Sequence, residues 1–378
     1  MHNPFNRSFG FVVGILALVI ALSISWTGCG DRSDLSSGPV ASNATVSLTK
    51  DNPTVRAIID VQNRHDAVLH QSSNVVGTAT GLLPDGRVGI IVYVKEDPSK
   101  LKGRSVDAAL PTSLEGVPVA INISGPFKAL KGHGGGGVSH TAIQTPPISL
   151  GTSGGWRYDL ANGYCCGGTL GSLVKIGTTQ YILSNYHVFR SDIVPGGNSR
   201  VATNGDPIIQ PGLIDVACNA AGAQNVGTLA GTASLPGHNV DCAIAQVISG
   251  MVRTDGAILE VGTISANTMS AFLGQAVKKS GRTSGLTRTT VAAINGNVSV
   301  QYDNECAGAN VFIQTYTNQV ILKGGTFIQS GDSGSLMVED AATNPRAVGL
   351  CFAGSGSSGV ANNISEVLAF LGASMVGQ

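Results

Sequence analysis

Charge is scarce in this chain. Lys, Arg, Asp and Glu together make up 12% of the 378 residues, whereas an average soluble protein has about 25%. The formal net charge is zero and no cluster of Lys and Arg occurs, so nothing points to nucleic acid or an acidic surface as a partner. Aromatic residues are also few, at 5%, and no repeat with a fixed period is visible.

Apolar residues and glycine are what the chain has in abundance. Hydrophobic residues make up 42% of it, which is enough to form a core and excludes wholesale disorder. Glycine occurs 51 times, among many Thr, Ser and Val residues. This combination is typical of a turn-rich β protein rather than of a helical one. The length allows about two or three domains.

The spacing of the cysteines does not match a zinc site, so the sequence predicts no metal and no cofactor. Cys165 and Cys166 are adjacent, and the other cysteines stand alone. Once Cys29 is set aside, an even number remains, and an oxidising compartment would permit these residues to pair. Sequence cannot choose among the about 15 possible connectivities of six cysteines. The six are Cys165, Cys166, Cys218, Cys242, Cys306 and Cys351.

The N-terminus reads as an export signal over residues 1–28. Arg7 supplies the positive start, and the uncharged run 9–24 is shorter than the about 20 residues that span a bilayer. The following Thr-Gly-Cys resembles a bacterial lipoprotein cleavage box with Cys29 as the lipidated residue, although Trp26 departs from the aliphatic pattern. Ordinary secretory cleavage and an uncleaved anchor remain alternatives. We therefore expect an exported protein, periplasmic, attached to the cell surface through Cys29, or secreted.

The next segments predict a tether, a small domain and a linker. Residues 29–50 are rich in Ser, Asn, Thr and Gly, which is typical of a flexible tether. Residues 51–128 predict a small α+β domain. Residues 129–147 contain a Gly-rich linker with His133, and His140 lies nearby. We interpret these histidines as incidental solvated residues, with a metal role as the alternative.

Within 51–128 the pattern predicts one helix and three strands. Asn52 and Pro53 are typical of a helix start, and apolar residues recur at helical spacing to about residue 70. A Pro-Asp-Gly turn separates the first two strands. The expected strands are Val75–Leu83, Val88–Val94 and Val117–Ile123.

The remainder, 148–378, predicts a mainly β domain that closes with a helix. Short apolar runs alternate with Gly, Asn and Pro, the pattern of a sandwich or a pair of barrels. Near the end, Asn363 precedes an apolar helical stripe, with Glu366 three residues later as in a capping box. The expected strand runs are 169–176, 181–183, 240–247, 276–278, 311–313, 320–322, 334–338 and 347–352.

The most specific chemical signal is Gly331-Asp332-Ser333-Gly334-Ser335. A serine hydroxyl needs a neighbouring base and donors for a developing oxyanion. Glycines on both sides allow the N–H groups of Gly331 and Ser333 to point into one space, which predicts an oxyanion hole. A plain surface turn is the alternative interpretation of this motif.

His187, at the end of an apolar run, is the candidate base. His238 is its rival but lies in a Pro-Gly-His-Asn loop, whereas His65 and His70 fall on the expected first helix. A histidine with a core or surface role remains the alternative for any one of them.

Asp241 is the candidate carboxylate that would orient His187, because it stands at the head of a buried β run. Asp215 is the runner-up, and a strand-capping role is the alternative for Asp241. The candidates occur in the order His, Asp, Ser, which is that of chymotrypsin. Subtilisins and α/β-hydrolases use other orders.

On these residues, 148–378 resembles a trypsin-like serine peptidase of the chymotrypsin clan, and the whole layout resembles bacterial peptidases related to plant narrow-leaf proteins. The resemblance implies two perpendicular six-stranded β-barrels, a serine endopeptidase site in their cleft, and a protein or peptide substrate. It places Phe327 at the base of the primary specificity pocket, which would disfavour Arg and Lys. The matching stretches are 166–171, 183–189, 209–212, 239–245 and 331–335.

Three features depart from that family. Val188 stands where a cysteine often follows the histidine, and Ser335 replaces a glycine. No Ile-Val-Gly-Gly activation sequence occurs, so Asp332 has no obvious new N-terminal ammonium as a partner. Two alternatives therefore stay open: a catalytically silent binding lipoprotein on the same fold, and a protease that cleaves only itself and releases residues 29–145.

Overall fold

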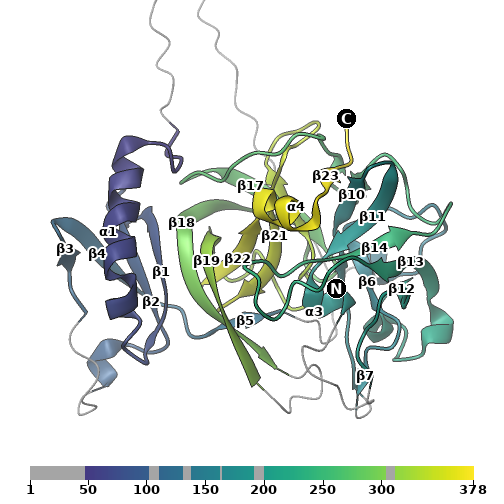
Figure 1. The fold of residues 1–378 in the computed structure, drawn as a ribbon, viewed down its shortest axis with the longest axis horizontal. Helices are drawn as coiled ribbons and strands as arrows, with labels where there is room; N and C mark the ends of the chain where they lie inside the picture. Colours follow the sequence, from purple (N-terminus) through teal and green to yellow (C-terminus); the bar gives the residue numbers. More distant parts are fainter. Residues whose placement is uncertain (1–46, 102–109, 131–137, 162–163, 191–199, 304–310) are drawn as a thin grey trace, which may run out of the picture. The chain divides into compact units, whose positions relative to one another are not determined.

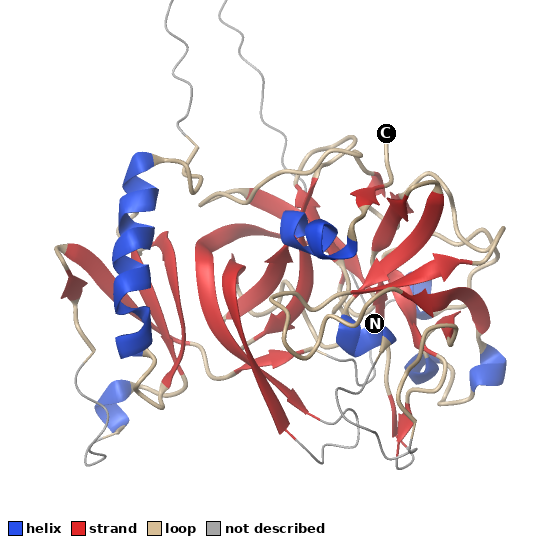
Figure 2. Ribbon diagram, viewed as in Figure 1, coloured by secondary structure: helices blue, strands red, loops and turns tan. Residues whose placement is uncertain are grey.

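Strands dominate the structure, a computed structural model that describes residues 47–101, 110–130, 138–161, 164–190, 200–303 and 311–378. Helices are few among these residues, and α4 (Ile364–Leu371) lies close to the C-terminus (Figure 2). Residues 46–378 form one compact unit. The prediction of a mainly β fold with a C-terminal helix is confirmed. The signal segment, Cys29, His133 and Cys306 lie outside the described residues.

Six strands of the larger sheet close into a barrel. In the order β17-β20-β21-β22-β19-β18 each strand is hydrogen-bonded to the next, and β17 also pairs with β18. Closure removes the free edges that an open sheet would expose. The strands are β17 (Ala276–Gly281), β18 (Gly285–Asp303), β19 (Val311–Lys323), β20 (Leu336–Glu339), β21 (Ala347–Gly354) and β22 (Ser358–Asn363).

The same sheet continues beyond β18 into the N-terminal segment. β18 pairs with β1, which is followed by β2, β4 and β3, while β5 pairs with both β18 and β21 (Figure 1). The segment 51–128 thus shares a sheet with the barrel, and its independence as a domain stays a prediction. The strands are β1 (Val75–Leu82), β2 (Val88–Val94), β3 (Ser113–Leu114), β4 (Val117–Ile123) and β5 (Phe127–Ala129).

A second, eight-stranded sheet holds most of the other strands of residues 148–378, in the order β23-β10-β11-β14-β13-β12-β6-β9. Its strands are β6 (Thr152–Trp156), β9 (Gly168–Leu170), β10 (Ser172–Ile176), β11 (Thr179–Ser184), β12 (Pro207–Gln210), β13 (Gln224–Ala230), β14 (Ala243–Val247) and β23 (Ser374–Met375). Two short hairpins complete the strands, β7 (Leu160–Ala161) with β8 (Tyr164–Cys165) and β15 (Ala257–Ile258) with β16 (Gly262–Thr263).

The two helices that the sequence predicts, α1 (Pro53–Leu69) and α4, begin at the expected residues, but one cap differs. Helix α1 starts as expected, because the Asn52 side chain accepts the N–H groups of Thr54 and Val55. Before α4, however, the Asn363 side chain makes no capping hydrogen bond and donates to the Asn318 carbonyl instead. The predicted capping box is therefore wrong, because tertiary contacts orient both of its side chains: the Asn363 amide donates to Asn318, and the Glu366 carboxylate accepts from Asn239 and Asn318. The other helices are α2 (Val138–Thr141) and α3 (Tyr186–Phe189).

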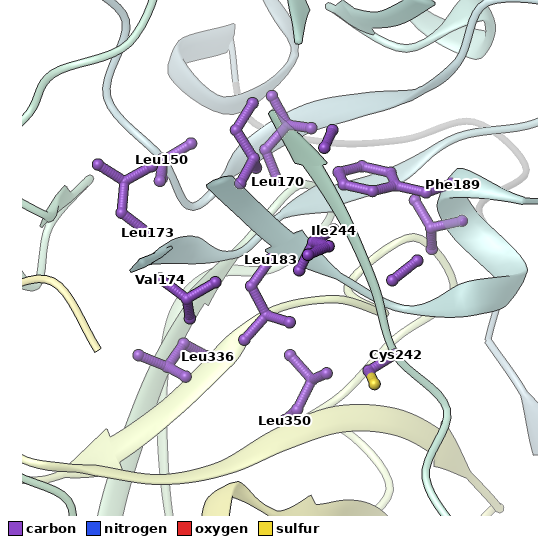
Figure 3. Packing of buried hydrophobic residues seen from close by; sticks show 14 of the residues in the cluster. Leu150, Leu170, Leu173, Val174, Leu183, Phe189, Cys242, Ile244, Leu336 and Leu350 are labelled. Atoms are coloured by element: carbon purple, nitrogen blue, oxygen red, sulfur yellow. The ribbon is translucent and has the colours of Figure 1, made fainter. Parts of the chain in front are cut away.

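One apolar core joins the two sheets. Leu173 and Leu183 of the eight-stranded sheet belong to the same buried cluster as Leu336 and Leu350 of the barrel. Figure 3 shows these side chains converging between ribbons of the two halves. Burying such leucines contributes roughly 1.5–3 kcal/mol each. The core therefore holds the two sheets together.

Gly171, between β9 and β10, marks the tightest approach of the two halves. A Cβ atom there would collide with the Gly334 carbonyl oxygen and lie 3.0 Å from the Leu183 carbonyl oxygen. We expect Gly171→Ala to lower the free energy of unfolding by about 1–3 kcal/mol, because two backbones would have to move apart. Denaturant titration measures this loss.

Gly155→Ala is the matched control in the same sheet, because its new Cβ would have no neighbour closer than 3.5 Å. It should cost less than about 1 kcal/mol. Equal unfolding midpoints for the two variants would contradict the close approach at Gly171.

Candidate active site

His187 and Asp241 are brought together by the pairing of β11 with β14. The register places Ser184 opposite Ala243, so the residues after β11 and before β14 meet. His187 then lies in the single turn of α3, and its Nδ1 is 2.6 Å from Asp241 Oδ2. The other oxygen, Oδ1, accepts the backbone N–H groups of Tyr186 and His187 at 2.7 and 3.3 Å.

This contact decides which nitrogen of His187 is free to act as a base. A carboxylate only accepts hydrogen bonds, so Nδ1 carries the proton and Nε2 keeps its lone pair. Nε2 is buried and has no hydrogen-bond partner within the described part of the chain. The imidazole is therefore held in the tautomer that general-base catalysis needs.

The Asp241 carboxylate has a further donor that the sequence reasoning missed. The Tyr302 hydroxyl, on β18, donates to Asp241 Oδ2 at 2.8 Å, and the Tyr316 hydroxyl, on β19, lies 2.6 Å from it. Because Tyr302 donates to the carboxylate, Tyr316 donates to Tyr302. Burial, and then the nearby Asp241 charge, raise the pKa of Tyr302 well above its usual value, so it stays a donor.

Ser333 lies in the tight loop that leads into β20. Gly331 and Gly334 have φ angles of +99° and +94°, a region that residues with a side chain rarely adopt. The Thr169 backbone N–H donates to the Ser333 carbonyl at 2.9 Å, and the Thr169 hydroxyl donates to the Gly331 carbonyl at 2.8 Å. A strand of the opposite sheet thus holds the serine loop on both sides.

The serine hydroxyl points to a backbone oxygen rather than to the imidazole. Ser333 Oγ donates to the Phe352 carbonyl at 3.2 Å, so no hydrogen bond joins it to His187 in this structure. The two elements are nevertheless neighbours. A Cβ atom on Gly168 would lie 2.6 Å from Val188 and 3.0 Å from the Ser333 carbonyl oxygen.

Asp332 is neutralised by a lysine, which the sequence reasoning also missed. Lys279 Nζ lies 3.0 Å from Asp332 Oδ2, and both side chains have no exposed surface. The carboxylate also accepts the backbone N–H groups of Thr283, Ser284 and Gln329. Lys279 thus supplies the cationic partner of Asp332. The sequence feature that could have revealed this ion pair is the pair of adjacent lysines, Lys278 and Lys279, in a strand with buried neighbours.

The Gly331 N–H, one of the two predicted oxyanion donors, is engaged by the chain itself. It donates to the Leu130 carbonyl oxygen at 2.9 Å. Leu130 directly follows β5, far from Gly331 in sequence. Within the described residues, this donor is therefore occupied by a backbone carbonyl.

The rival candidates lie elsewhere. Asp215, the runner-up carboxylate, forms a two-point ion pair with Arg282 at 2.8 and 2.5 Å. His238 is exposed and its ring packs against Phe370. His65 contacts Glu115, and His70 contacts Asp66. None of these rings contacts Asp241.

Phe327 is buried in an apolar cluster that Leu130 packs against. It does not line the adjacent cavity of about 490 Å³, whereas the next residue, Ile328, does. The absence of a side chain at Gly354 leaves room for Leu130, because a Cβ atom at that position would lie 2.8 Å from Leu130 Cδ1.

Two cysteines form a described disulfide, Cys165 with Cys218, while Cys242 and Cys351 are buried and free. In the described ranges, no group of three or more His, Cys, Asp or Glu side chains could hold a metal ion. His140 is not solvated as expected, because its buried ring contacts the Gly151 carbonyl and Glu260. Among the helices that the structure describes, none is long and apolar enough to cross a membrane.

One family model and several solved structures match parts of the chain. A family model described as the Nal1 C-terminal domain matches residues 231–366, a stretch that contains Asp241 and Ser333 but not His187. No curated protein matches the chain in sequence.

Solved serine proteases resemble it at low identity. A glutamic acid specific serine protease is 20% identical over 60% of this chain and 100% of its own, with a TM-score of 0.40. Protease A of Thermobifida fusca is 19% identical over 61% and 99%, with a TM-score of 0.40. Cellulomonas bogoriensis chymotrypsin is 20% identical over 61% and 99%, with a TM-score of 0.39.

The Lys279–Asp332 pair generates a prediction about stability. Lys279→Met leaves a buried carboxylate without its counter-charge, which should lower the free energy of unfolding by about 3–5 kcal/mol. Lys278→Met is the matched control, because its partner Asp340 is partly exposed and 3.9 Å away. Denaturant titration should show a much smaller loss for Lys278→Met, and equal losses would contradict the assignment.

Proposed function

We propose that this chain is a serine endopeptidase in which Ser333 is the nucleophile, His187 the general base and Asp241 the orienting carboxylate. The observation that carries the proposal is the 2.6 Å contact between His187 Nδ1 and Asp241 Oδ2, which leaves Nε2 as a buried, unpartnered acceptor. A base held in one tautomer, next to a serine loop built from positive-φ glycines, supports acyl transfer better than a structural role.

In the proposed reaction, Ser333 Oγ adds to a peptide carbonyl carbon while His187 Nε2 takes the hydroxyl proton. The imidazolium is stabilised by Asp241, and it then gives its proton to the leaving amine nitrogen as the C–N bond breaks. Water attacks the resulting ester and restores the serine. All steps use groups of this chain and water.

The N–H groups of Gly331 and Ser333 would bind the oxyanion, each worth about 3 kcal/mol in comparable sites. The support for Gly331 is direct, since its N–H already binds a peptide carbonyl oxygen, that of Leu130. Asp332 and Lys279 would keep this loop in place without a new N-terminus.

The proposed substrate is a protein or peptide, in the periplasm, at the cell surface or outside the cell. The disulfide between Cys165 and Cys218 supports an oxidising compartment. Lipid attachment at Cys29 remains a prediction from sequence alone, as does the absence of nucleic acid among the partners.

A fluorophosphonate probe tests the nucleophile. We expect one covalent adduct on Ser333 in the purified chain and none in Ser333→Ala, because the probe needs a serine activated by a base. Peptide mapping by mass spectrometry locates the adduct. Labelling that survives Ser333→Ala would refute the assignment, and a silent binding protein would give no adduct at all.

Tyr302 provides a second test, directed at the carboxylate. Tyr302→Phe removes one donor from buried Asp241 and should slow labelling of Ser333 by roughly ten- to a hundredfold, the value of a hydrogen bond to a charged group. Tyr316→Phe is the matched control, since its hydroxyl touches Tyr302 and not the carboxylate. It should slow labelling by only a few fold. An unchanged rate in Tyr302→Phe would exclude a positioning role.

A further inference from the structure

The segment just before the Gly-rich stretch lies along the active site as an added strand. β5 pairs antiparallel with β21, Ala129 opposite Ala353 and Lys128 opposite Gly354 (Figure 1). The pairing extends one residue further, because the Leu130 N–H donates to the Phe352 carbonyl at 3.4 Å. Addition of a strand to a sheet edge is a common way for a protein to bind an extended peptide.

Leu130 is hydrogen-bonded on both its N–H and its carbonyl oxygen to residues around Ser333. Its N–H shares the Phe352 carbonyl oxygen with Ser333 Oγ, which lies 3.2 Å from that oxygen. Its own carbonyl oxygen accepts the Gly331 N–H at 2.9 Å. A peptide carbonyl is thereby bound by a proposed oxyanion donor, beside the hydroxyl that would attack it. An acyl group awaiting attack needs this placement.

The side chain of Leu130 has a matching place. It packs against the buried cluster that includes Phe327 and Ile328, and it lines the cavity of about 490 Å³ with Gly354 and Ser330. Lys128, on the occupying segment itself, is the one charged residue that lines this cavity among the described residues. Outside the occupying segment the cavity lining is uncharged, so the rest of the described chain offers Leu130 an apolar contact and supplies no counter-charge for an acidic or basic residue.

We infer that residues 127–130 are an internal substrate, that Ser333 cleaves the peptide bond after Leu130, and that leucine-like residues are the preferred acyl-side residues of other substrates. This inference rests on the proposed function. It adds which peptide bond is cut, which class of side chain is preferred, and which segment of the chain occupies the site. The next residue in sequence is Lys131, which lies outside the described residues.

The reaction balances as a hydrolysis. Ser333 Oγ bonds to the Leu130 carbonyl carbon and its proton goes to His187 Nε2. The bond from that carbon to the nitrogen of residue 131 breaks, and His187 protonates the departing amine. Water then adds to the ester carbon, Ser333 regains its proton, and Leu130 keeps a carboxylate.

Cleavage there would not release the N-terminal part by itself. β1 remains hydrogen-bonded to β18, and β5 remains between β18 and β21. The new Leu130 carboxylate would stay in the site as a bound product and keep external substrates out. Ser333 and His187 are 0% and 2% exposed in this structure, as expected for a site with its occupant in place.

Intact mass spectrometry of the purified full chain tests the bond. Under denaturing conditions we expect two fragments, one ending at Leu130 and one beginning at Lys131, that elute together in native gel filtration. Ser333→Ala should stay in one piece. A full chain that carries the fluorophosphonate adduct on Ser333 but is cut at a different bond, or at none, would overturn the inference and leave the proposed function standing.

Substitutions at Leu130 test the occupant. Leu130→Met keeps an apolar side chain of similar size and should still be cut, whereas Leu130→Asp should stay uncut. Labelling of Ser333 in Leu130→Asp should be at least about tenfold faster than in the parent chain, because a tethered occupant competes at millimolar effective concentration. A gain in rate cannot arise from misfolding. An equal labelling rate would overturn the inference.

Two peptides extend the test to external substrates. With the Leu130→Asp variant, Phe-Lys-Ala-Leu p-nitroanilide should be hydrolysed at least about tenfold faster than Phe-Lys-Ala-Asp p-nitroanilide. Equal rates would overturn the assigned preference. Absence of both the adduct and hydrolysis in every variant would instead overturn the proposed function, and the inference with it.

Discussion

The buried Asp241 carboxylate is the interaction on which the arrangement of the candidate site depends. It accepts hydrogen bonds from the His187 ring, from two backbone N–H groups of α3 and from the Tyr302 hydroxyl. The backbone bonds hold the turn, the ring bond sets the tautomer, and the phenol reaches in from the barrel. Because an unpaired buried charge costs several kcal/mol, these donors and the carboxylate stabilise one another, and the two sheets meet at one carboxylate.

A second buried carboxylate, that of Asp332, holds the serine loop in place in the same way. Asp332 combines the Lys279 ammonium with several backbone donors, and the loop it anchors presents the Gly331 N–H. Asp215 and Arg282 add a further ion pair, and the Arg282 N–H donates to the Thr169 hydroxyl that holds the loop. Although the chain has few charged residues overall, several of them form ion pairs around this one loop.

The N-terminal segment contacts the candidate site directly. Its strands extend the barrel sheet through β1 and β18, and its last described residue places a carbonyl oxygen on the Gly331 N–H. The segment is thus both part of the sheet and next to Ser333, because Leu130 and Ser333 donate to the same Phe352 carbonyl oxygen. In this arrangement Ser333 and His187 are almost fully buried.

Sequence by itself determined the features that rest on local pattern. The bounds of β2 and β4, the start of α1 and the motif around Ser333 follow from alternation, capping and glycine spacing. The strand expectations also failed in two places: β18 was not expected, and the two expected runs 311–313 and 320–322 belong to one strand, β19. Only the tertiary structure decided that Tyr302, Lys279 and Leu130 belong to the site. Each reaches it from a distant strand or strand end through register and barrel closure, which depend on long-range pairing that no local pattern encodes.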